Sequence, residues 1–302
     1  ELNRVQGLDF NFALFTNITS DHLDFHENFE KYLAAKKTLF DLIEKNSKAI
    51  VNTDDKSFSE LIRHTKADVI KYGFDNTADY TIKDVSFNLS GTKFSIIAEG
   101  EEYKFSTTLI GKFNAYNAAA AFAVGHQLGI EKQKLIDGIN STPQIPGRFE
   151  VVKRGNKTVV IDYSHTAGSL EEALTAIKKI VHDNNKVHTV FGCGGDRDKT
   201  KRPIMGEIAS RLSDKVYVTS DNPRTEDPMK IIEDILPGIK NQNYDVHESR
   251  EEAIKAAIKS SEENAVILIA GKGHETYQEI NGVRNFFSDK DTATKYLEEY
   301  CN

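Results

Sequence analysis

The chain has 302 residues and a formal net charge of −7, and this length allows two domains with separate cores. The acidic balance argues against a nucleic-acid partner, because such partners usually require a clustered basic face. No apolar run approaches the roughly 20 residues of a membrane span, and Cys193 and Cys301 have no metal-site spacing, so we expect a protein of the reducing cytoplasm without membrane insertion.

The first half of the chain mixes strands and helices. Apolar residues at helical spacing predict a helix over Asn28–Ile43, and an alanine-rich stretch predicts another over Asn117–Leu128. Between these helices, short apolar runs and alternating runs separated by turns predict strands and hairpins. The strands that we expect in this half are Phe12–Thr16, Ala49–Asn52, Val69–Tyr72, Tyr80–Val85, Lys93–Ile97 and Tyr103–Thr108.

A boundary follows at Ser141–Gly147, which contains two of the six prolines and a glycine and is typical of a hinge. We therefore divide the chain into residues 1–147 and 148–302. Beyond the hinge, strands alternate with helical stretches, and this alternation predicts an α/β fold with a parallel, doubly wound sheet. The strands expected here are Val159–Tyr163, Val187–Phe191, Lys215–Thr219 and Val266–Ala270.

Four polar loops follow these four strands, and ligands of open α/β sheets bind beyond the carboxyl ends of the strands. One such loop is common, but four in one sheet predict a shared polar site for a ligand with several charges. The glycine loop at Gly192 has Arg197 where G-x-G-x-x-G requires its third glycine, so a dinucleotide site is not expected. The loops are 162–165, 192–198, 220–224 and 271–275.

A second group of polar residues lies in Thr16–His26 and is followed by Lys36. On spacing alone, Asp and Ser here favour a helix N-terminal cap, while a magnesium site is the alternative, because Mg²⁺ needs only one or two protein ligands besides water and phosphate. Lys36 is spaced from Leu33 and Phe40 so as to lie near the apolar face of its helix, whereas Lys37 is expected to point to solvent. A lysine with a packed stem and a solvated ammonium is the simplest interpretation of Lys36.

Taken together, the motifs resemble the Mur ligase family, and within it the enzymes that add a diamino acid. Each motif is weak alone, but all of them occur in order and cover nearly the whole chain. They are TNITSDHLDFH, YLAAKKTLF, GKFNAYNAAAA, IPGRFE, VVIDYSHT, FGCGGDRDKTKRP, TSDNPRTEDP and AGKGHETYQ.

The resemblance implies a role for individual residues. It implies that residues 1–147 are the remainder of a central ATP-binding domain and that residues 148–302 are a C-terminal, Rossmann-like, amino-acid-binding domain. His22 and a carbamylated Lys36 (N6-carboxylysine) would hold Mg²⁺, and Arg4 would contact the muramoyl peptide. The implied ATP contacts are Asn114, Asn117, Arg148, Asp162 and His165, and the implied diamino-acid contacts are Arg197, Asn222, Arg224, Gly271 and Glu275.

The implied reaction is ATP-driven amide formation in peptidoglycan precursor synthesis. The D-glutamate carboxylate of UDP-MurNAc-L-Ala-D-Glu is activated as an acyl phosphate, and the amine of meso-diaminopimelate attacks it. Arg224, with Arg197, would bind the distal carboxylate of the diamino acid, while Asn222 and Glu275 would pair with its distal ammonium. We expect a monomeric enzyme of the bacterial cytoplasm.

The chain departs from the family in two places. It lacks a G-x-x-x-x-G-K-[ST] phosphate loop and begins at Glu1 without a start methionine, so we expect it to be part of a longer protein and inactive by itself. Asp162-Tyr-Ser-His-Thr-Ala-Gly-Ser169 differs from the family's Ala-His-Thr-Pro-Asp form. The alternatives are a related ligase that uses lysine or meso-lanthionine, a folylpolyglutamate synthetase, or a module that only binds nucleotide or amino acid.

Overall fold

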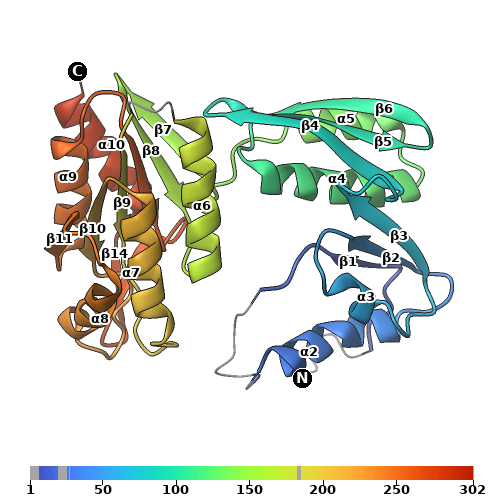
Figure 1. Cartoon of the computed structure of the whole chain (residues 1–302), viewed down its shortest axis with the longest axis horizontal. Coiled ribbons are helices and arrows are strands. Elements are labelled where there is room, and N and C mark those ends of the chain that lie inside the picture. Colours follow the sequence, from blue (N-terminus) through green and yellow to red (C-terminus); the bar gives the residue numbers. More distant parts are fainter. Residues whose placement is uncertain (1–6, 20–25, 27, 182–184, 302) are drawn as a thin grey trace. The chain divides into compact units, whose positions relative to one another are not determined.

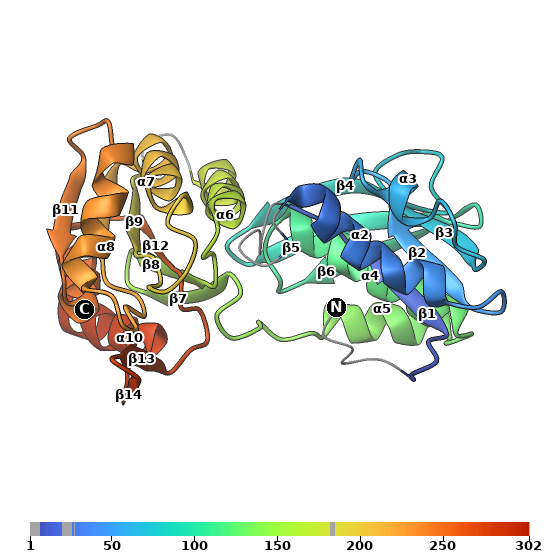
Figure 2. The same cartoon turned by 90° about the horizontal axis from the view of Figure 1, so that it is seen from below.

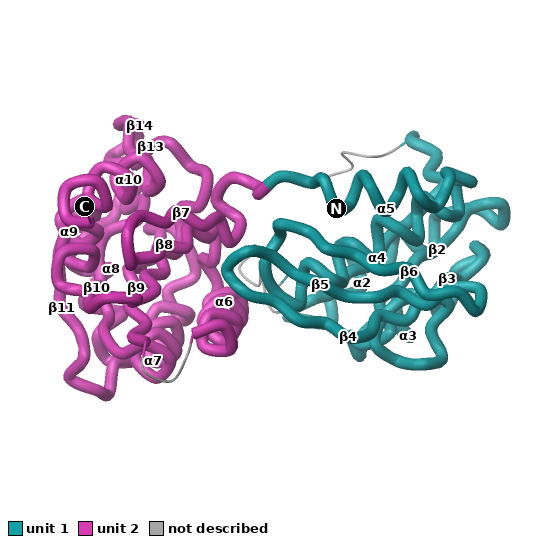
Figure 3. Tube along the Cα trace, turned by 90° about the horizontal axis from the view of Figure 1, so that it is seen from above, with its two compact units in different colours: residues 1–143 teal, residues 144–302 magenta. Residues whose placement is uncertain are grey.

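The computed structural model describes residues 7–19, 26, 28–181 and 185–301. The chain forms two compact units, residues 1–143 and 144–302, shown in different colours in Figure 3. The division between Pro143 and Gln144 lies inside the segment that the sequence marks as a hinge.

Unit 1 contains a six-stranded sheet in the order β1-β2-β3-β4-β5-β6 (Figure 1). Strands β1 to β4 pair in parallel, and β4, β5 and β6 form an antiparallel meander. All the strands predicted in this half are confirmed, with ends that differ by a few residues. Their bounds are Phe12–Phe15 (β1), Lys48–Asn52 (β2), Asp68–Gly73 (β3), Tyr80–Asn88 (β4), Gly91–Ala98 (β5) and Glu101–Thr107 (β6).

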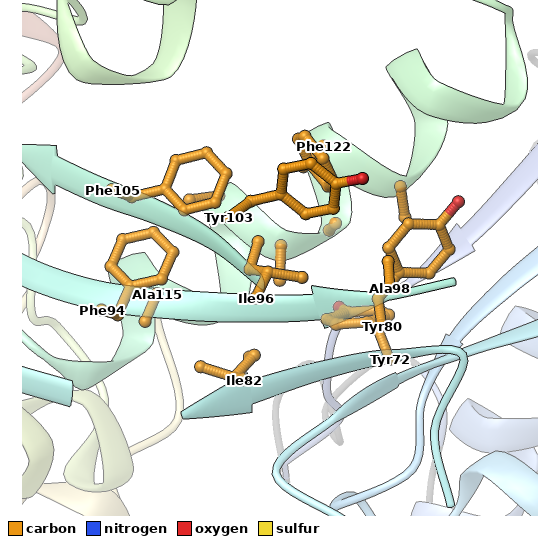
Figure 4. Close-up of a cluster of buried hydrophobic side chains, with 14 of the residues drawn as sticks. Tyr72, Tyr80, Ile82, Phe94, Ile96, Ala98, Tyr103, Phe105, Ala115 and Phe122 are labelled. Atoms are coloured by element: carbon orange, nitrogen blue, oxygen red, sulfur yellow. The ribbon is translucent and has the colours of Figure 1, made fainter. Parts of the chain in front are cut away.

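The helices of unit 1 cover both faces of this sheet. Since side chains alternate along each strand, neighbouring residues of a strand pack against helices on opposite faces. In β2, Ile50 packs in the cluster that contains α4, whereas its neighbours Ala49 and Val51 pack with α2 and α3. The alanines of α4 let the helix lie close to the strands, and the Phe122 ring packs against aromatic rings of the sheet (Figure 4). The helices are Phe29–Leu42 (α2), Phe58–Leu61 (α3), Lys112–Gln127 (α4) and Lys132–Asn140 (α5).

Helix α4 begins at Lys112 rather than at the predicted Asn117. Its N-cap is Gly111, at a φ of 105° that favours glycine. The alanine run starts only at Ala118, so the run alone placed the predicted start too late.

Unit 2 contains the predicted doubly wound sheet, in the order β11-β10-β9-β12-β8-β7. All strand pairs of this six-stranded sheet are parallel except β7 with β8. The sequence missed the edge strands β7 and β11, which are short and partly exposed. The bounds are Glu150–Arg154 (β7), Lys157–Asp162 (β8), Val187–Phe191 (β9), Lys215–Thr219 (β10), Tyr244–His247 (β11) and Val266–Ala270 (β12), with a separate hairpin of Tyr277–Ile280 (β13) and Val283–Phe286 (β14).

Helices flank this second sheet on both faces, with α6 and α7 on one side and α10 on the other (Figures 1 and 2). Residues of α9 and α10 form one buried cluster with apolar residues of the central strands. In the part of the chain that the structure describes, no helix combines the length and apolar character needed to cross a membrane. The helices are Ala167–Ile180 (α6), Lys201–Leu212 (α7), Pro228–Ile235 (α8), Arg250–Ser260 (α9) and Asp289–Tyr300 (α10), with a short 3-10 turn at Leu236–Gly238 (η1).

Candidate functional site

The four polar loops singled out in the sequence follow β8, β9, β10 and β12, which are adjacent and parallel in the order β10-β9-β12-β8. Parallel neighbours end at the same edge of a sheet, so the loops share the carboxyl edge of unit 2. Glycines allow the loops to approach each other closely. A side chain at Gly192 would place its Cβ 2.1 Å from the carbonyl oxygen of Thr219, a distance that no Cβ can occupy.

Two loops meet through a buried polar cluster of Asn222, Lys272 and Glu275. The amide nitrogen of Asn222 donates to Glu275 Oε2 at 2.8 Å. Lys272 is 0% exposed, and its ammonium donates to Asn222 Oδ1 at 3.0 Å and to Glu275 Oε2 at 3.2 Å. The structure therefore brings together two predicted amino-acid contacts around a lysine that sequence reasoning did not assign.

Arg224 has a strained backbone that a hairpin holds in place. Its φ is 50°, which is uncommon for a residue other than glycine. Its backbone N–H donates to Glu279 at 3.0 Å, and its carbonyl accepts from the N–H of Asn281 at 2.7 Å. Both partners belong to the β13–β14 hairpin, which the sequence analysis missed although the turn Asn281-Gly282 is a strong hairpin signal.

The guanidinium of Arg224 lies against the glycine loop. Its Nη1 donates to the carbonyl of Gly195 at 2.7 Å, and a Cβ at Gly194 would lie 3.0 Å from the same atom. Only one of the five guanidinium N–H groups is used in this bond. Arg197 belongs to the same loop and is exposed, and its Nη1 donates to the carbonyl of Asp196 at 3.0 Å.

An ion-pair network links the loop after β9 to the loop after β10. Arg202 is 0% exposed and binds Glu226 at 2.8 Å and Asp234 at 2.8 Å. Glu226 also pairs with Lys199 and accepts the N–H of Asp196. The Arg202 guanidinium, together with these bonds, lowers the pKa of Glu226 to about 2. Glu226 thus supports the loops that present the two arginines.

A second buried pair lies behind the loop after β12. Arg250 and Asp289 are 1% and 0% exposed and are joined by two hydrogen bonds, of 2.7 Å and 2.8 Å. Arg250 also donates to the carbonyl of Ala270, the last residue of β12. Gly271 follows at a φ of 116°, and a Cβ at this position would lie 2.6 Å from Asp221 Oδ2, so only glycine fits here. This predicted contact would bind a ligand through its backbone.

The predicted ATP contacts are divided between the two units. In unit 1, Asn114 is buried and bonds the carbonyl of Ile110, and the exposed Asn117 donates to Asn114. Both lie on α4, one turn apart.

In unit 2, the remaining predicted ATP contacts surround the end of β8. The Arg148 guanidinium lies 4.8 Å from the centre of the Tyr163 ring, and the centre of the His165 ring lies 4.7 Å from that of the same ring. Asp162 accepts bonds from the Phe149 N–H and the Ser164 hydroxyl. Burial raises the pKa of Asp162, although these bonds and Arg148 act in the opposite direction.

One orientation predicted for α2 is wrong. Lys37 is buried, at 9% exposed, and forms an ion pair with Asp41, whereas Lys36 is exposed. Lys37 lies three residues before Phe40, the most buried side chain of α2, and four before Asp41, so that both its stem and its ammonium find partners. The ammonium of Lys36 lies 5.2 Å from the centre of the Tyr32 ring.

Two further predictions, the roles of His22 and Arg4, lie outside the described residues. Within residues 7–19, 26, 28–181 and 185–301, no group of three or more His, Cys, Asp or Glu side chains could hold a metal ion. Lys36 is therefore the one predicted metal ligand whose surroundings are described.

Comparison with known families gives two matches. Residues 1–125 match the Mur ligase middle domain, and residues 147–273 match the glutamate ligase domain of Mur ligases. The chain is 43% identical over 302 residues to UDP-N-acetylmuramoyl-L-alanyl-D-glutamate–2,6-diaminopimelate ligase 1 of Clostridium acetobutylicum, with 99% of this chain and 61% of that protein covered. The corresponding ligase of Bacillus cereus is 42% identical, with 100% of this chain and 62% of that protein covered.

Solved structures give the same result. A structure of a UDP-N-acetylmuramoyl-L-alanyl-D-glutamate–2,6-diaminopimelate ligase matches with a TM-score of 0.64 at 35% identity, covering 98% of this chain and 62% of that one. The MurF ligase from Thermotoga maritima, solved with ADP, shares the fold with a TM-score of 0.72 at 19% identity, covering 97% and 62%. The chain thus spans about three fifths of the length of the curated relatives that it matches.

Proposed function

Since this chain belongs to the Mur ligase family, we propose that it supplies the middle and C-terminal parts of an ATP-dependent ligase that joins meso-diaminopimelate to UDP-MurNAc-L-Ala-D-Glu. Several relatives of about 40% identity are, by name, ligases of UDP-N-acetylmuramoyl-L-alanyl-D-glutamate and 2,6-diaminopimelate. The γ-phosphoryl group of ATP passes to the D-glutamate carboxylate, and ADP leaves. The diamino acid's amine then attacks the acyl carbon, phosphate leaves, and the amine loses a proton.

In unit 2, the residues at the carboxyl edge bind the end of the diamino acid that does not react. Arg224 has four N–H groups that do not contact Gly195, so it can grip a carboxylate with two parallel hydrogen bonds. Arg197 is exposed in the neighbouring loop and shares that carboxylate. The carboxylate of Glu275 and the backbone of Gly271 receive the distal ammonium. Lysine has the ammonium but lacks this carboxylate.

ATP and Mg²⁺ bind mainly through residues whose roles come from the family resemblance. Asn114 and Asn117 lie beside the adenine, and Arg148, Asp162 and His165 contact the nucleotide from unit 2. His22 and a carbamylated Lys36 would hold Mg²⁺, which when bound neutralises charge on the phosphates. The exposure of Lys36 supports this assignment, because carbamylation requires carbon dioxide to reach an amine that is not paired in the core. Arg4 contacts the muramoyl peptide.

The observation that carries the proposal is Arg224, which is held by the hairpin and the glycine loop with most of its donors unused. In the full-length enzyme, Arg224→Ala should lower kcat/KM for meso-diaminopimelate by about 100-fold or more, because two charge-assisted bonds of about 1.5–3 kcal/mol each are lost. The poor rate with lysine should hardly change. Wild type should prefer meso-diaminopimelate over lysine by orders of magnitude, since an enclosed, unpaired guanidinium disfavours lysine.

Steady-state rates with both amino acids measure this difference. Arg154→Ala is the matched control, because Arg154 ends the antiparallel strand β7 at the opposite edge of the sheet and pairs with Glu298 on the surface. Equal losses on both substrates for Arg224→Ala, or no loss on either, would show that Arg224 does not recognise the carboxylate. Including meso-lanthionine in the same assay separates the two substrates that share a distal amino-carboxyl end.

The alternative, a module that only binds nucleotide or amino acid, applies to the chain by itself. It contains no phosphate loop, and we propose that residues 1–302 alone do not turn over. ATP hydrolysis, measured in the presence of both other substrates, on this chain and on the full-length protein separates binding from catalysis.

A further inference from the structure

The fully buried ammonium of Lys272 lies among the residues that we assign to the diamino acid. Besides its bonds to Asn222 and Glu275, its Nζ lies 5.4 Å from the centre of the Tyr277 ring. A buried ammonium is costly unless it is paired and hydrogen-bonded. The bonds that satisfy it therefore fix the orientation of the neighbouring polar groups.

Lys272 determines what Asn222 can offer to a ligand. Asn222 Oδ1 accepts from Lys272 Nζ at 3.0 Å and from the backbone N–H of Glu279 at 2.9 Å. Both partners can only donate, so the atom between them must be the amide oxygen, and both of its lone pairs are used. The amide nitrogen already gives one N–H to Glu275. Its second N–H remains, and Asn222 is therefore a donor.

The same bonds leave Glu275 with one available oxygen. Oε2 accepts from both Asn222 and Lys272, whereas Oε1 is 3.5 Å from the Tyr277 hydroxyl. The side chain of Glu275 is 16% exposed. Oε1 is thus the acceptor for the distal ammonium, and Asn222 faces the carboxylate side of the ligand. This revises our expectation from the sequence that Asn222 and Glu275 both bind the ammonium.

We propose that Lys272 is a positioning residue that sets this donor–acceptor pattern and so determines recognition of the distal amino-carboxyl end. The proposal rests on the proposed function. Without the ammonium, the Asn222 amide can rotate and present its oxygen, and Glu275 loses the cation that holds its carboxylate.

The test uses the full-length enzyme with Lys272→Met, which keeps the length of the side chain, and Lys272→Arg, which keeps the charge. Lys272→Met should raise KM for meso-diaminopimelate roughly 30-fold and leave KM for ATP within about twofold, because discrimination by a polar site depends on satisfied partners. Lys272→Arg should recover part of this loss. Glu275→Gln and the double variant complete a cycle, in which the double loss should be well below the product of the single losses, since residues in one network are coupled.

Equal increases of both KM values, or losses that multiply in the double variant, would overturn the positioning role. Thermal unfolding of each variant shows whether it folds. If Lys272→Met does not fold, Asn222→Asp gives an independent result. A donor at this position predicts that Asn222→Asp raises KM for meso-diaminopimelate, and an unchanged or lower KM would contradict it. A wild-type enzyme that ligates no diamino acid would instead refute the proposed function.

Discussion

At the scale of single residues, buried cations stabilise the loops at the carboxyl edge of unit 2. Lys272, Arg202 and Arg250 each bridge elements that are distant in sequence, and each is 0–1% exposed. Removing one partner of a buried ion pair lowers the free energy of unfolding by more than the pair itself contributes, because an uncompensated charge remains in the core. These cations therefore fix loop geometry more than they contribute net stability.

Glu226 allows a test of this argument through pH. Its pKa of about 2 is below the ordinary value of 4.5, so its pairing with Arg202 stabilises the fold fully above about pH 4.5, and this stability is lost as the pH falls toward 2. Glu226→Gln should lower the free energy of unfolding by about 2 kcal/mol at pH 7, the size of a charge-assisted bond. The difference between wild type and variant should shrink as the pH falls below 4.5.

Urea unfolding of wild type and Glu226→Gln at several pH values between 7 and 3 measures this convergence. Glu263→Gln is the control, because Glu263 is exposed after α9 and its substitution should change stability by less than about 0.5 kcal/mol. A constant difference between wild type and Glu226→Gln across this range would show that ionisation of Glu226 is not coupled to folding.

Residue-level prediction from the sequence was correct for the position of the loops and failed where packing decides which side chain is buried. The loops that contain Asn222, Arg224 and Glu275 were placed at the correct sheet edge because each follows a predicted parallel strand. Lys36 and Lys37 both border the apolar stripe of α2, and helical spacing cannot tell which of them faces the core. Lys272 was missed because burial of a lysine depends on partners contributed by another loop.

At the scale of elements, the departure Thr166-Ala-Gly-Ser169 forms the start of α6. Thr166 is the N-cap, its side chain accepts the N–H of Ser169, and the Ser169 hydroxyl accepts the N–H of Thr166. This reciprocal pair is a capping box with serine in the third position. Ala167 and Gly168, which stand where the family's form has Pro-Asp, are thus the first two residues of the helix that follows the predicted nucleotide contacts Asp162 and His165.

Thr166→Ala should therefore destabilise unit 2 by about 1 kcal/mol, the usual cost of losing an N-cap side chain. Thr166→Ser keeps the hydroxyl and should lie within a few tenths of a kcal/mol of wild type. Chemical denaturation of both variants, compared at equal m-values, gives the two differences. If Thr166→Ser loses as much as Thr166→Ala, the effect comes from the methyl group and not from the cap.

Elements with strong local patterns were predictable, and those that depend on their neighbours were not. Buried parallel strands were found, and β9, β10 and β12 have the predicted bounds, whereas β8 begins two residues earlier and ends one residue earlier than predicted. The edge strands β7 and β11 contain charged residues and are only half-buried, so their pairing depends on the strand beside them. The β13–β14 hairpin had a readable turn signal, but its exposed Phe286 and Val283 do not follow the alternation of a strand with one buried face.

At the scale of the whole molecule, the predicted ATP contacts come from both units, whereas the predicted diamino-acid contacts all come from unit 2. Under the proposed function, both units must contribute contacts to one nucleotide during catalysis. The connection must then be able to change its backbone angles without disturbing either core. Proline and glycine in a sequence can indicate such a connection. They do not show which of its residues are packed against a unit and which are exposed.

Limited proteolysis locates the free part of this connection. The exposed residues of this segment are Ser141, Pro143, Ile145 and Pro146. Gly147, in contrast, is held in place: its N–H donates to Glu150, its φ is 67°, and a Cβ at this position would lie 2.0 Å from the backbone nitrogen of His274. We therefore expect a broad-specificity protease to cut between Ser141 and Pro146, and not at Gly147 or beyond, because cleavage needs an exposed and mobile backbone. Mass spectrometry of the early products identifies the bond.

The C-terminal product should resist further digestion and unfold cooperatively, because residues 144–302 have their own sheet and core and a unit of this size can fold alone. Adding ATP with meso-diaminopimelate and the muramoyl dipeptide to the full-length enzyme should slow cleavage at this segment, since bound substrates favour the approach of the units. Early cuts inside the parallel strands of unit 2, with the segment from Ser141 to Pro146 intact, would place the flexible connection elsewhere in the chain.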